Sequence, residues 1–292
     1  MTTTFDALTA RIEAGDRLAP AEVRDLAAAP DILQIGMLAD AARRRLRGTT
    51  VTYVRVARCA FDQSLADAVP PAAREVRLTG APASLAQAVA AVESARAVAG
   101  ERAVTGFSWV DLAPLGAMSA VLPALRAAGL DGLAELPLDR LDNAAEALDR
   151  LVSAGFQQLR LTIDKAAGEA REALLFKAAD LQDRFAAIQA LNPLPLTVNS
   201  LRPTTGYDDV KSVAVARLAA TNIPVIQVDW LRYGPKLAQV ALTFGADDLD
   251  EVSVSDESPD GRRRAPIEEV RRNIEAAGFT PAERDGRFAV VL

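Results

Sequence analysis

The sequence predicts an α/β fold, a (β/α)8 barrel of the TIM type with a helical extension at its N-terminus. Short runs rich in β-branched residues alternate with helical segments of ten or more residues. Such alternation requires parallel strands joined by right-handed crossovers. Seven or eight such units favour a barrel over an open sheet, and the 292 residues suit a fold that usually has ~250. Whether the barrel closes completely stays open at this stage.

The chain is expected to form a single barrel domain, residues 1–292. Residues 1–48 form its N-terminal helices and residues 49–292 its barrel. The first helix covers residues 5–14, and the second covers 20–29 with a proline at its first position. Asp31 is a suitable N-cap for a third helix over residues 32–47, which Gly48 ends.

Eight strands and seven helices are expected to follow. The strands have β-branched or alternating apolar residues and cover residues 50–56, 75–78, 103–109, 132–136, 158–163, 194–198, 223–230 and 249–254. The helices, several of which end at a glycine, cover residues 84–99, 120–128, 143–154, 169–191, 208–220, 235–244 and 267–277.

Composition excludes several classes of function. The net charge of −6, with scattered Lys and Arg, argues against a nucleic-acid-binding surface. No run approaches the ~18 apolar residues of a membrane span, and the N-terminus lacks the pattern of a signal peptide, so we expect a cytoplasmic protein. The chain has no histidine and one cysteine, Cys59. An intrachain disulfide is therefore impossible, and any acid–base chemistry must use Asp, Glu, Lys, Tyr or Cys59.

The last third of the chain has the most specific pattern. It includes Arg202-Pro203-Thr204-Thr205-Gly206-Tyr207-Asp208-Asp209, then residues 212–218, 222–224, 234–242 and 244–250. This succession resembles the radical-SAM enzymes of the futalosine route to menaquinone, namely aminofutalosine synthase and cyclic dehypoxanthine futalosine synthase, to which the FO synthases are related. Weaker matches at residues 38–41, 128–131 and 266–285 extend the resemblance over nearly the whole chain.

The chain departs from that family where the family binds its cofactor. The resemblance implies three cysteines spaced C-x3-C-x2-C after the first strand, which hold a [4Fe–4S] cluster that binds SAM. Here the three positions are Arg55, Cys59 and Asp62. We therefore predict a degenerate iron–sulfur site without a cluster, and leave open whether SAM still binds. We expect Arg55 and Asp62 to form an ion pair or an anion site near the barrel mouth, since an unpaired buried charge is costly. Cys59 is interpreted as a small buried filler rather than a reactive thiol.

Function in such barrels gathers at the carboxyl ends of the strands. The ligand-binding candidates at those ends are Thr79, Trp109, Glu135, Asp164, Asn199, Arg202, Asp229, Trp230, Arg232 and Tyr233. Ser108, Asp111 and Lys165 lie there too, and helix capping or solvation explains Asp111 and Asp164 at least as well as function does. Residues 229–234 combine two aromatics with two opposite charges, which suits a nucleoside-like or aromatic carboxylate ligand. No metal site is expected, and no catalytic residue is assigned.

The favoured functional prediction is a pseudoenzyme: a cluster-less homologue that acts as a binding or regulatory protein of the futalosine pathway. Its partner would be a small nucleoside-like or aromatic ligand, a cluster-bearing homologue or another menaquinone-pathway protein. The alternative is an enzyme of the same pathway that uses acid–base chemistry without radicals. A third possibility is a radical-SAM enzyme that borrows cluster ligands from a partner chain.

Overall fold

The computed structural model describes residues 5–63, 69–196, 205–254 and 267–291 of the chain. Its strands are β1 (Thr50–Ala60), β2 (Glu75–Thr79), β3 (Ala103–Ser108), β4 (Gly132–Pro137), β5 (Leu159–Thr162), β6 (Ile188–Asn192), β7 (Val225–Asp229), β8 (Asp248–Ser253) and β9 (Thr280–Glu283). Its α-helices are α1 (Phe5–Ala14), α2 (Pro20–Ala28), α3 (Ile32–Arg47), α4 (Leu85–Ala99), α5 (Trp109–Leu112), α6 (Met118–Ala127), α7 (Ala144–Ser153), α8 (Gly168–Phe185), α9 (Gly206–Ala219), α10 (Trp230–Tyr233), α11 (Pro235–Thr243) and α12 (Ile267–Ala276).

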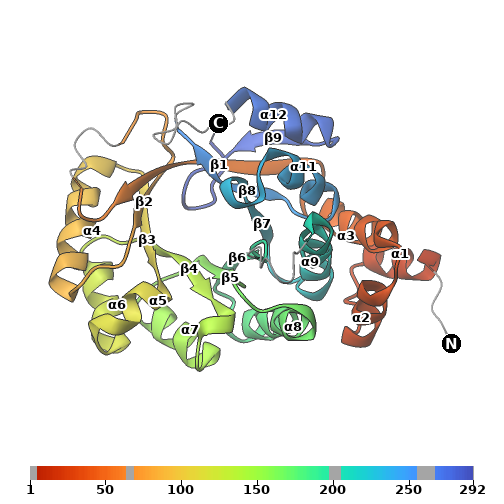
Figure 1. Ribbon diagram of the computed structural model, residues 1–292, viewed down its shortest axis with the longest axis horizontal. Helices are drawn as coiled ribbons and strands as arrows, with labels where there is room; N and C mark the ends of the chain where they lie inside the picture. The colour runs from red at the N-terminus through yellow and green to blue at the C-terminus, as the bar shows by residue number, and fades with distance from the viewer. Residues whose placement is uncertain (1–4, 64–68, 197–204, 255–266, 292) are drawn as a thin grey trace.

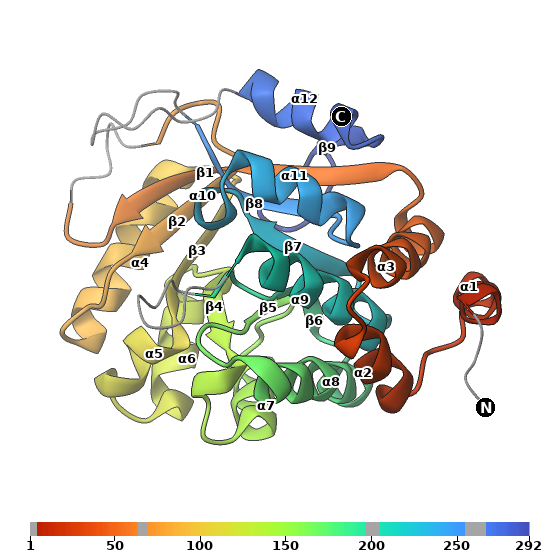
Figure 2. The ribbon, with the colours of Figure 1, turned by 45° about the vertical axis from the view of Figure 1, so that its right-hand side comes forward.

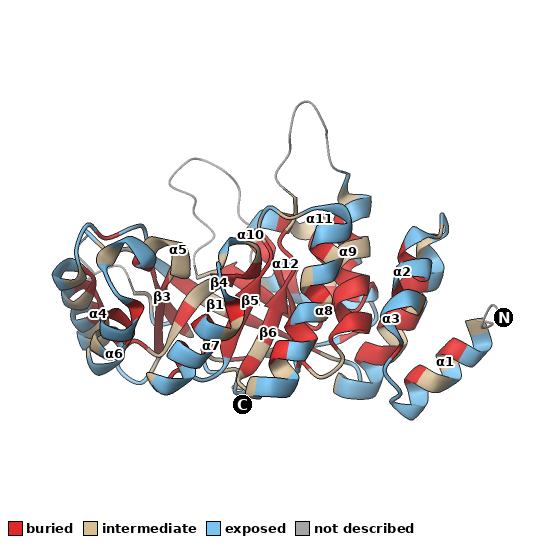
Figure 3. Cartoon of the chain, turned by 90° about the horizontal axis from the view of Figure 1, so that it is seen from below, coloured by how far each residue is buried: buried red, intermediate tan, exposed pale blue. Residues whose placement is uncertain are grey.

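Strands β1 to β8 form a closed parallel barrel. Each strand from β2 to β8 pairs with the next in sequence, β8 pairs with β1, and β1 pairs with β2. The helices lie outside this ring, as Figures 1 and 2 show. Buried residues gather on the strands and on the faces of the helices that cover them (Figure 3). The predicted barrel is confirmed, and the question of closure is answered.

The N-terminal extension has the three predicted helices, with ends close to those expected. The Asp31 carboxylate accepts a hydrogen bond of 2.9 Å from the backbone N–H of Leu33, which satisfies one of the free donors at the start of α3. Helix α3 packs along α9 and brings the extension against the barrel wall (Figure 1). It ends at Gly48, whose φ of 60° is unfavourable for residues with a side chain.

The sixth strand lies earlier in the chain than predicted. The long helix α8 ends at Phe185, because Ala186 adopts the left-handed conformation with a φ of 50°, and β6 follows at Ile188–Asn192. The prediction of a strand over 194–198 is wrong for its described part, since residues 193–196 belong to no strand. The physical reason is the pair Pro193 and Pro195, which have no N–H to donate to a neighbouring strand.

Strand β9 was not predicted, because Thr280–Glu283 contains a proline and has no alternating apolar pattern. It pairs with the first half of β1, at Thr50–Tyr53, whereas β2 pairs with the second half, from Val56 onward. Glu283 lies at this branch point. Its carboxylate accepts from Arg55 Nε at 2.5 Å and from Arg74 Nη2 at 3.1 Å, so one anion joins β9, β1 and the start of β2.

A network of buried charges fills the interior of the barrel. Arg77 Nη2 lies 2.7 Å from a carboxylate oxygen of Glu75, and both nitrogens of its fork contact Asp250 at 2.9 Å. Arg160 binds both oxygens of Glu75 at 2.9 Å. Burial by itself would raise the pKa of Glu75, but Arg160 and Arg77 outweigh that effect and lower it to about 2.

The segment after β9 completes this network. Arg284 enters the barrel and binds both oxygens of Asp248, at 2.6 and 2.8 Å. The three guanidinium groups of Arg77, Arg160 and Arg284 therefore balance the three carboxylates of Glu75, Asp248 and Asp250, and all six side chains are buried. A buried charge is tolerated when it is paired and hydrogen-bonded in this way.

Within the described residues no single helix is long and apolar enough to cross a membrane; the bent pair Trp109–Leu115 and Met118–Ala127 reaches that length and composition only when taken together.

Replacing Arg160 by methionine tests the network. The variant leaves Glu75 buried with half of its cation contacts, and we expect a loss of roughly 3 kcal/mol in the free energy of unfolding, measured by urea denaturation. The matched control is Arg272→Met, which removes a charge at an exposed position of α12 and should change stability by about 0.5 kcal/mol or less. Equal stability of the two variants would contradict this account.

Candidate functional site

A cavity of about 240 Å³ opens at the carboxyl ends of the barrel strands. Its walls come from the ends of β1, β2, β3, β4, β7 and β8, from α5 and from the start of α10. The charged side chains that line it are Arg58, Arg77, Asp111, Glu135, Asp229, Arg232 and Glu251. Leu231 is partly exposed and supplies apolar surface, whereas Leu78 and Phe107 lie buried in the wall behind the cavity. A small, partly apolar pocket with converging polar groups at this face of a barrel is the usual place for a ligand.

Two residues of this cavity have a backbone conformation that is unfavourable for residues with a side chain. Phe107 has a φ of 57° and Glu251 has a φ of 58°. At Glu251 the pairing of β8 with β1 shifts register, which is the signature of a β-bulge. The bulge lets two consecutive carboxylates, Asp250 and Glu251, contact the same guanidinium of Arg77, at 2.9 and 2.6 Å. Strain of this kind gathers at functional sites.

The charges of the cavity form two linked groups. Glu251 contacts the buried Arg77 and also Arg58, whose Nε lies 3.3 Å from its second oxygen. Arg232 binds the carboxylate of Glu135 and lies 3.4 Å from Asp229. Arg58 and Arg232 are about half exposed, with 50% and 43% of the side chain accessible, so both keep part of the guanidinium free to contact a ligand.

Asp229 is a buried carboxyl group of this cavity whose pKa lies near neutral pH. Its Oδ1 accepts hydrogen bonds of 2.9 Å from the N–H groups of Leu231 and Arg232, which caps α10. Burial raises the pKa of Asp229 and the charge of Glu251 raises it further; Arg232 opposes both, and the result is about 7. A carboxyl group of this pKa in a cavity can hold or release a proton near neutral pH.

Some of the predicted ligand-binding candidates line the cavity. Thr79, Glu135, Asp229 and Arg232 all line it. Ser108 and Asp111 also line it, and the Asp111 carboxylate accepts from the N–H of Ser108 at 2.9 Å, so the capping interpretation of Asp111 is confirmed.

Other predicted residues lie elsewhere. Trp230 and Tyr233 are only 3% and 7% exposed and belong to the apolar core, where the Tyr233 hydroxyl donates to the carbonyl of Pro193 at 2.6 Å. Residues 229–234 therefore direct their charges to the cavity and their aromatic rings into the core. Trp109 lines a separate hollow beside α7, and Asp164 lies 3.9 Å from Arg140.

Two candidates, Asn199 and Arg202, fall outside the described residues.

Four cavity residues escaped the sequence analysis: Arg58, Arg77, Phe107 and Glu251. Arg58 and Arg77 lie within strands and point inward, and a charge at such a position is a signal that could have been used. The positive φ of Phe107 and the bulge at Glu251 have no equivalent signal in the sequence.

The degenerate cluster positions do not come together. Arg55 binds Glu283, whereas Asp62 is exposed and has no ion pair within the described part of the chain. The predicted Arg55–Asp62 pair is therefore wrong, because β9 brings a closer carboxylate to Arg55. Cys59 is a buried free thiol in the apolar core. Alternation along β1 places it on the face opposite Arg58, away from the cavity, and burial raises the pKa of its thiol.

A [4Fe–4S] cluster needs several thiolates that converge, and the residues at these three positions do not fit it. In the described ranges no group of three or more His, Cys, Asp or Glu side chains could hold a metal ion. Asp247 and Asp248, for which no metal role was expected, are engaged by Arg217 and Arg284, both at 2.6 Å.

Comparison with known proteins identifies the last third of the chain. Residues 194–291 match the family model described as the CofH/MqnC C-terminal region. The match covers the last third of the chain. The aminodeoxyfutalosine synthase of Streptomyces coelicolor is 34% identical over 93 residues, which are 30% of this chain and 24% of that enzyme. The 5-amino-6-(D-ribitylamino)uracil–L-tyrosine 4-hydroxyphenyl transferase of Archaeoglobus fulgidus is 33% identical over 124 residues, or 38% of this chain and 36% of that enzyme.

These alignments span between a quarter and about a third of the relatives' lengths. They confirm the predicted resemblance to radical-SAM enzymes of the futalosine route. Solved structures agree in fold. Methylornithine synthase (PylB) superimposes with a TM-score of 0.69 at 15% identity, covering 94% of this chain and 97% of that one. The FeFe-hydrogenase maturase HydG from Carboxydothermus hydrogenoformans gives a TM-score of 0.69 at 11% identity, covering 97% and 80%.

The pKa of Asp229 predicts an unusual dependence of stability on pH. Because folding raises this pKa from 3.8 to about 7, the folded state holds a proton between these values that the unfolded state has lost, so stability falls as pH rises through the window. Lowering the pH from 8 to 5.5 should therefore raise the free energy of unfolding of the native chain. The gain should exceed that of Asp229→Asn by ~2 kcal/mol, because the variant keeps the helix cap but does not titrate. Urea denaturation at both pH values measures the difference, and parallel pH profiles would contradict the assignment.

Proposed function

We propose that this chain is a cluster-less homologue of menaquinone- and FO-type radical-SAM enzymes that binds a small ligand and acts as a binding or regulatory protein of the futalosine pathway. One observation is central to the proposal. The only thiol of the chain, Cys59, is buried in the apolar core on the outer face of β1, whereas the cavity at the barrel mouth keeps an ordered polar lining. The chain thus keeps a cavity for a small molecule but lacks the cysteine thiolates that would bind a cluster.

The chemistry of the cavity supports a particular class of ligand. Arg58 and Arg232 offer partly free guanidinium groups at its rim, which suit a carboxylate or a phosphate. Leu231, which is partly exposed, offers apolar contact for a ring. A nucleoside-like or aromatic carboxylate ligand combines these two features. The protein partner in this proposal is a cluster-bearing homologue or another protein of the same pathway, in keeping with the sequence relationship.

Native mass spectrometry of the protein purified from its host tests the ligand. We expect a small molecule that is retained under native conditions and lost on denaturation. Arg232→Met removes one of the two rim cations and should reduce retention about tenfold, which corresponds to ~1.4 kcal/mol. Arg272→Met, which makes the same charge change on the exposed face of α12, should retain the molecule fully. Equal retention in both variants, or a native chain without any bound molecule, would contradict a ligand site at the mouth.

One observation favours the second candidate function, an enzyme that works by acid–base chemistry without radicals. Asp229 lines the cavity and has a pKa of about 7, the range in which a general base is most effective at neutral pH.

The two candidates differ in the effect of one substitution. Once the retained molecule is identified, an enzyme should convert it, and Asp229→Asn should lower kcat by roughly 10²–10⁴-fold while leaving binding nearly intact. Turnover assays with the native chain and with Asp229→Asn decide the question. If the native chain binds the molecule but never converts it, the binding function stands and the catalytic candidate is rejected.

A further inference from the structure

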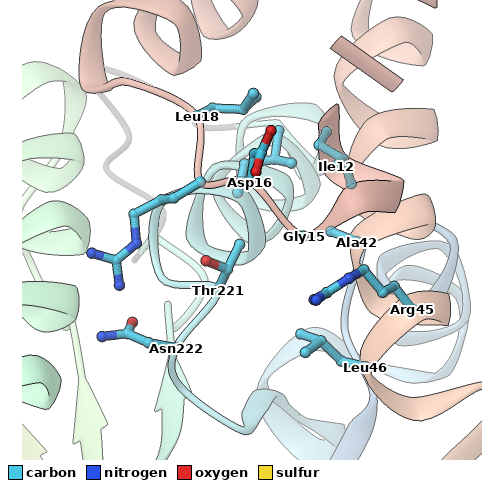
Figure 4. A pocket seen from close by; sticks show the side chains of 11 residues that line it. Ile12, Gly15, Asp16, Leu18, Ala42, Arg45, Leu46, Thr221 and Asn222 are labelled. Atoms are coloured by element: carbon cyan, nitrogen blue, oxygen red, sulfur yellow. The ribbon is translucent and has the colours of Figure 1, made fainter. Parts of the chain in front are cut away.

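A second pocket lies beside the segment that leads into β7, at the amino ends of the barrel strands, whereas the cavity at the mouth lies at their carboxyl ends. It has a volume of about 270 Å³ and lies between the turn after α1, the last turns of α3 and the segment between α9 and β7 (Figure 4). Five aliphatic side chains form most of its wall: Ile12, Leu18, Ala42, Leu46 and Leu218. Four of these, all except Leu46, are buried in the core of the protein. Among the five, Leu46 keeps the most accessible surface, at 37%, and an apolar group in the pocket would cover it.

Arg45 is the charged side chain that reaches across this pocket. In Figure 4 its guanidinium extends from α3 toward Thr221. The turn at Gly15 passes close to this guanidinium, since a Cβ there would lie 2.1 Å from Arg45 Nη2, and its φ of 93° favours glycine. Among the described residues Arg45 has neither a hydrogen bond nor an ion pair. Its donors are free for a ligand.

The neighbouring arginines of α3, unlike Arg45, each lie close to a carboxylate. Arg43 and Arg44 both bind Asp40, at 3.0 and 2.7 Å, and Arg47 lies 3.9 Å from Asp247. Three of the four arginines in this basic run therefore have a structural partner. The fourth, Arg45, is an exposed side chain at the rim of the pocket, where its unpaired charge can attract an anion.

The other polar groups of the pocket are fixed or lie at its edge. Arg17 is paired with Asp183 at 3.0 Å, and the same carboxylate accepts from Asn222 Nδ2 at 2.7 Å, so this wall is neutral and held in place. Asp16 is exposed, and in Figure 4 its carboxylate lies toward Leu18, on another side of the pocket from Arg45. An anionic ligand would therefore place its charge against Arg45 and Thr221, away from Asp16.

We propose that this pocket is a binding site for a small amphipathic carboxylate, with the carboxylate on Arg45 and the aliphatic part against Leu46 and the aliphatic wall beside it. The site is independent of the cavity at the barrel mouth. Guanidinium–carboxylate hydrogen bonds are charge-assisted and orient the ligand, while the aliphatic wall supplies the hydrophobic contribution. Both parts are needed, because a purely polar anion gains nothing from the wall and an aliphatic cation is repelled by Arg45.

Ligand-observed NMR with three probes tests the proposal on the full chain. Hexanoate should show saturable binding, whereas inorganic phosphate and hexylamine should bind at least tenfold more weakly. Arg45→Met keeps the aliphatic stem and removes the charge, and should weaken hexanoate binding at least tenfold. Arg272→Met is the control of equal charge and should bind as the native chain does.

A blocking variant checks the location. Thr221→Tyr places a ring in the pocket without removing Arg45 and should also abolish hexanoate binding. Three outcomes would overturn the proposal: no saturable binding of hexanoate to the native chain, binding that Arg45→Met leaves unchanged, or hexylamine that binds as well as hexanoate.

Discussion

The guanidinium of Arg77 is the interaction on which the barrel interior depends. It contacts Glu75 on its own strand and Asp250 and Glu251 on β8, and so links β2 to β8 across β1 through buried charges. Arg160 and Arg284 complete the balance, and the second of these enters only because β9 inserts beside β1. Since a buried carboxylate without its cation is costly, each member of the network constrains the others. The network also forms the floor of the cavity at the mouth, because Arg77 belongs to both.

That arrangement explains how the mouth of the barrel keeps an ordered site. The bulge at Glu251 turns one further carboxylate toward the mouth, where it meets Arg58 and raises the pKa of Asp229. The resulting lining is polar, fixed by ion pairs and open to solvent at two guanidinium groups. Cys59, by contrast, packs on the other face of β1 with the core. One face of β1 therefore lines the cavity and the other packs in the core, because side chains alternate between the two faces of a strand.

Local signals in the sequence predicted most elements of the fold. Asp31 and Gly48 fixed the ends of α3, and alternating runs located seven of the eight barrel strands. The eighth, β6, was misplaced because the apolar residues 194–198 suggested a strand and the left-handed Ala186 gave no warning that α8 ends early. At the site, Thr79, Glu135, Asp229 and Arg232 were predicted because strand ends meet at one face. Arg77 and Glu251 were missed, since their roles depend on partners more than 170 residues away and on a bulge.

The central claim is that this chain holds no iron–sulfur cluster, because its only thiol faces the core. Anaerobic reconstitution with iron and sulfide, followed by desalting and measurement of bound iron and of visible absorption, tests it most directly. The account predicts that the native chain retains no more iron than Cys59→Ala and stays colourless. A brown protein whose iron and sulfide are close to one cluster per chain, and whose colour is lost in Cys59→Ala, would contradict it.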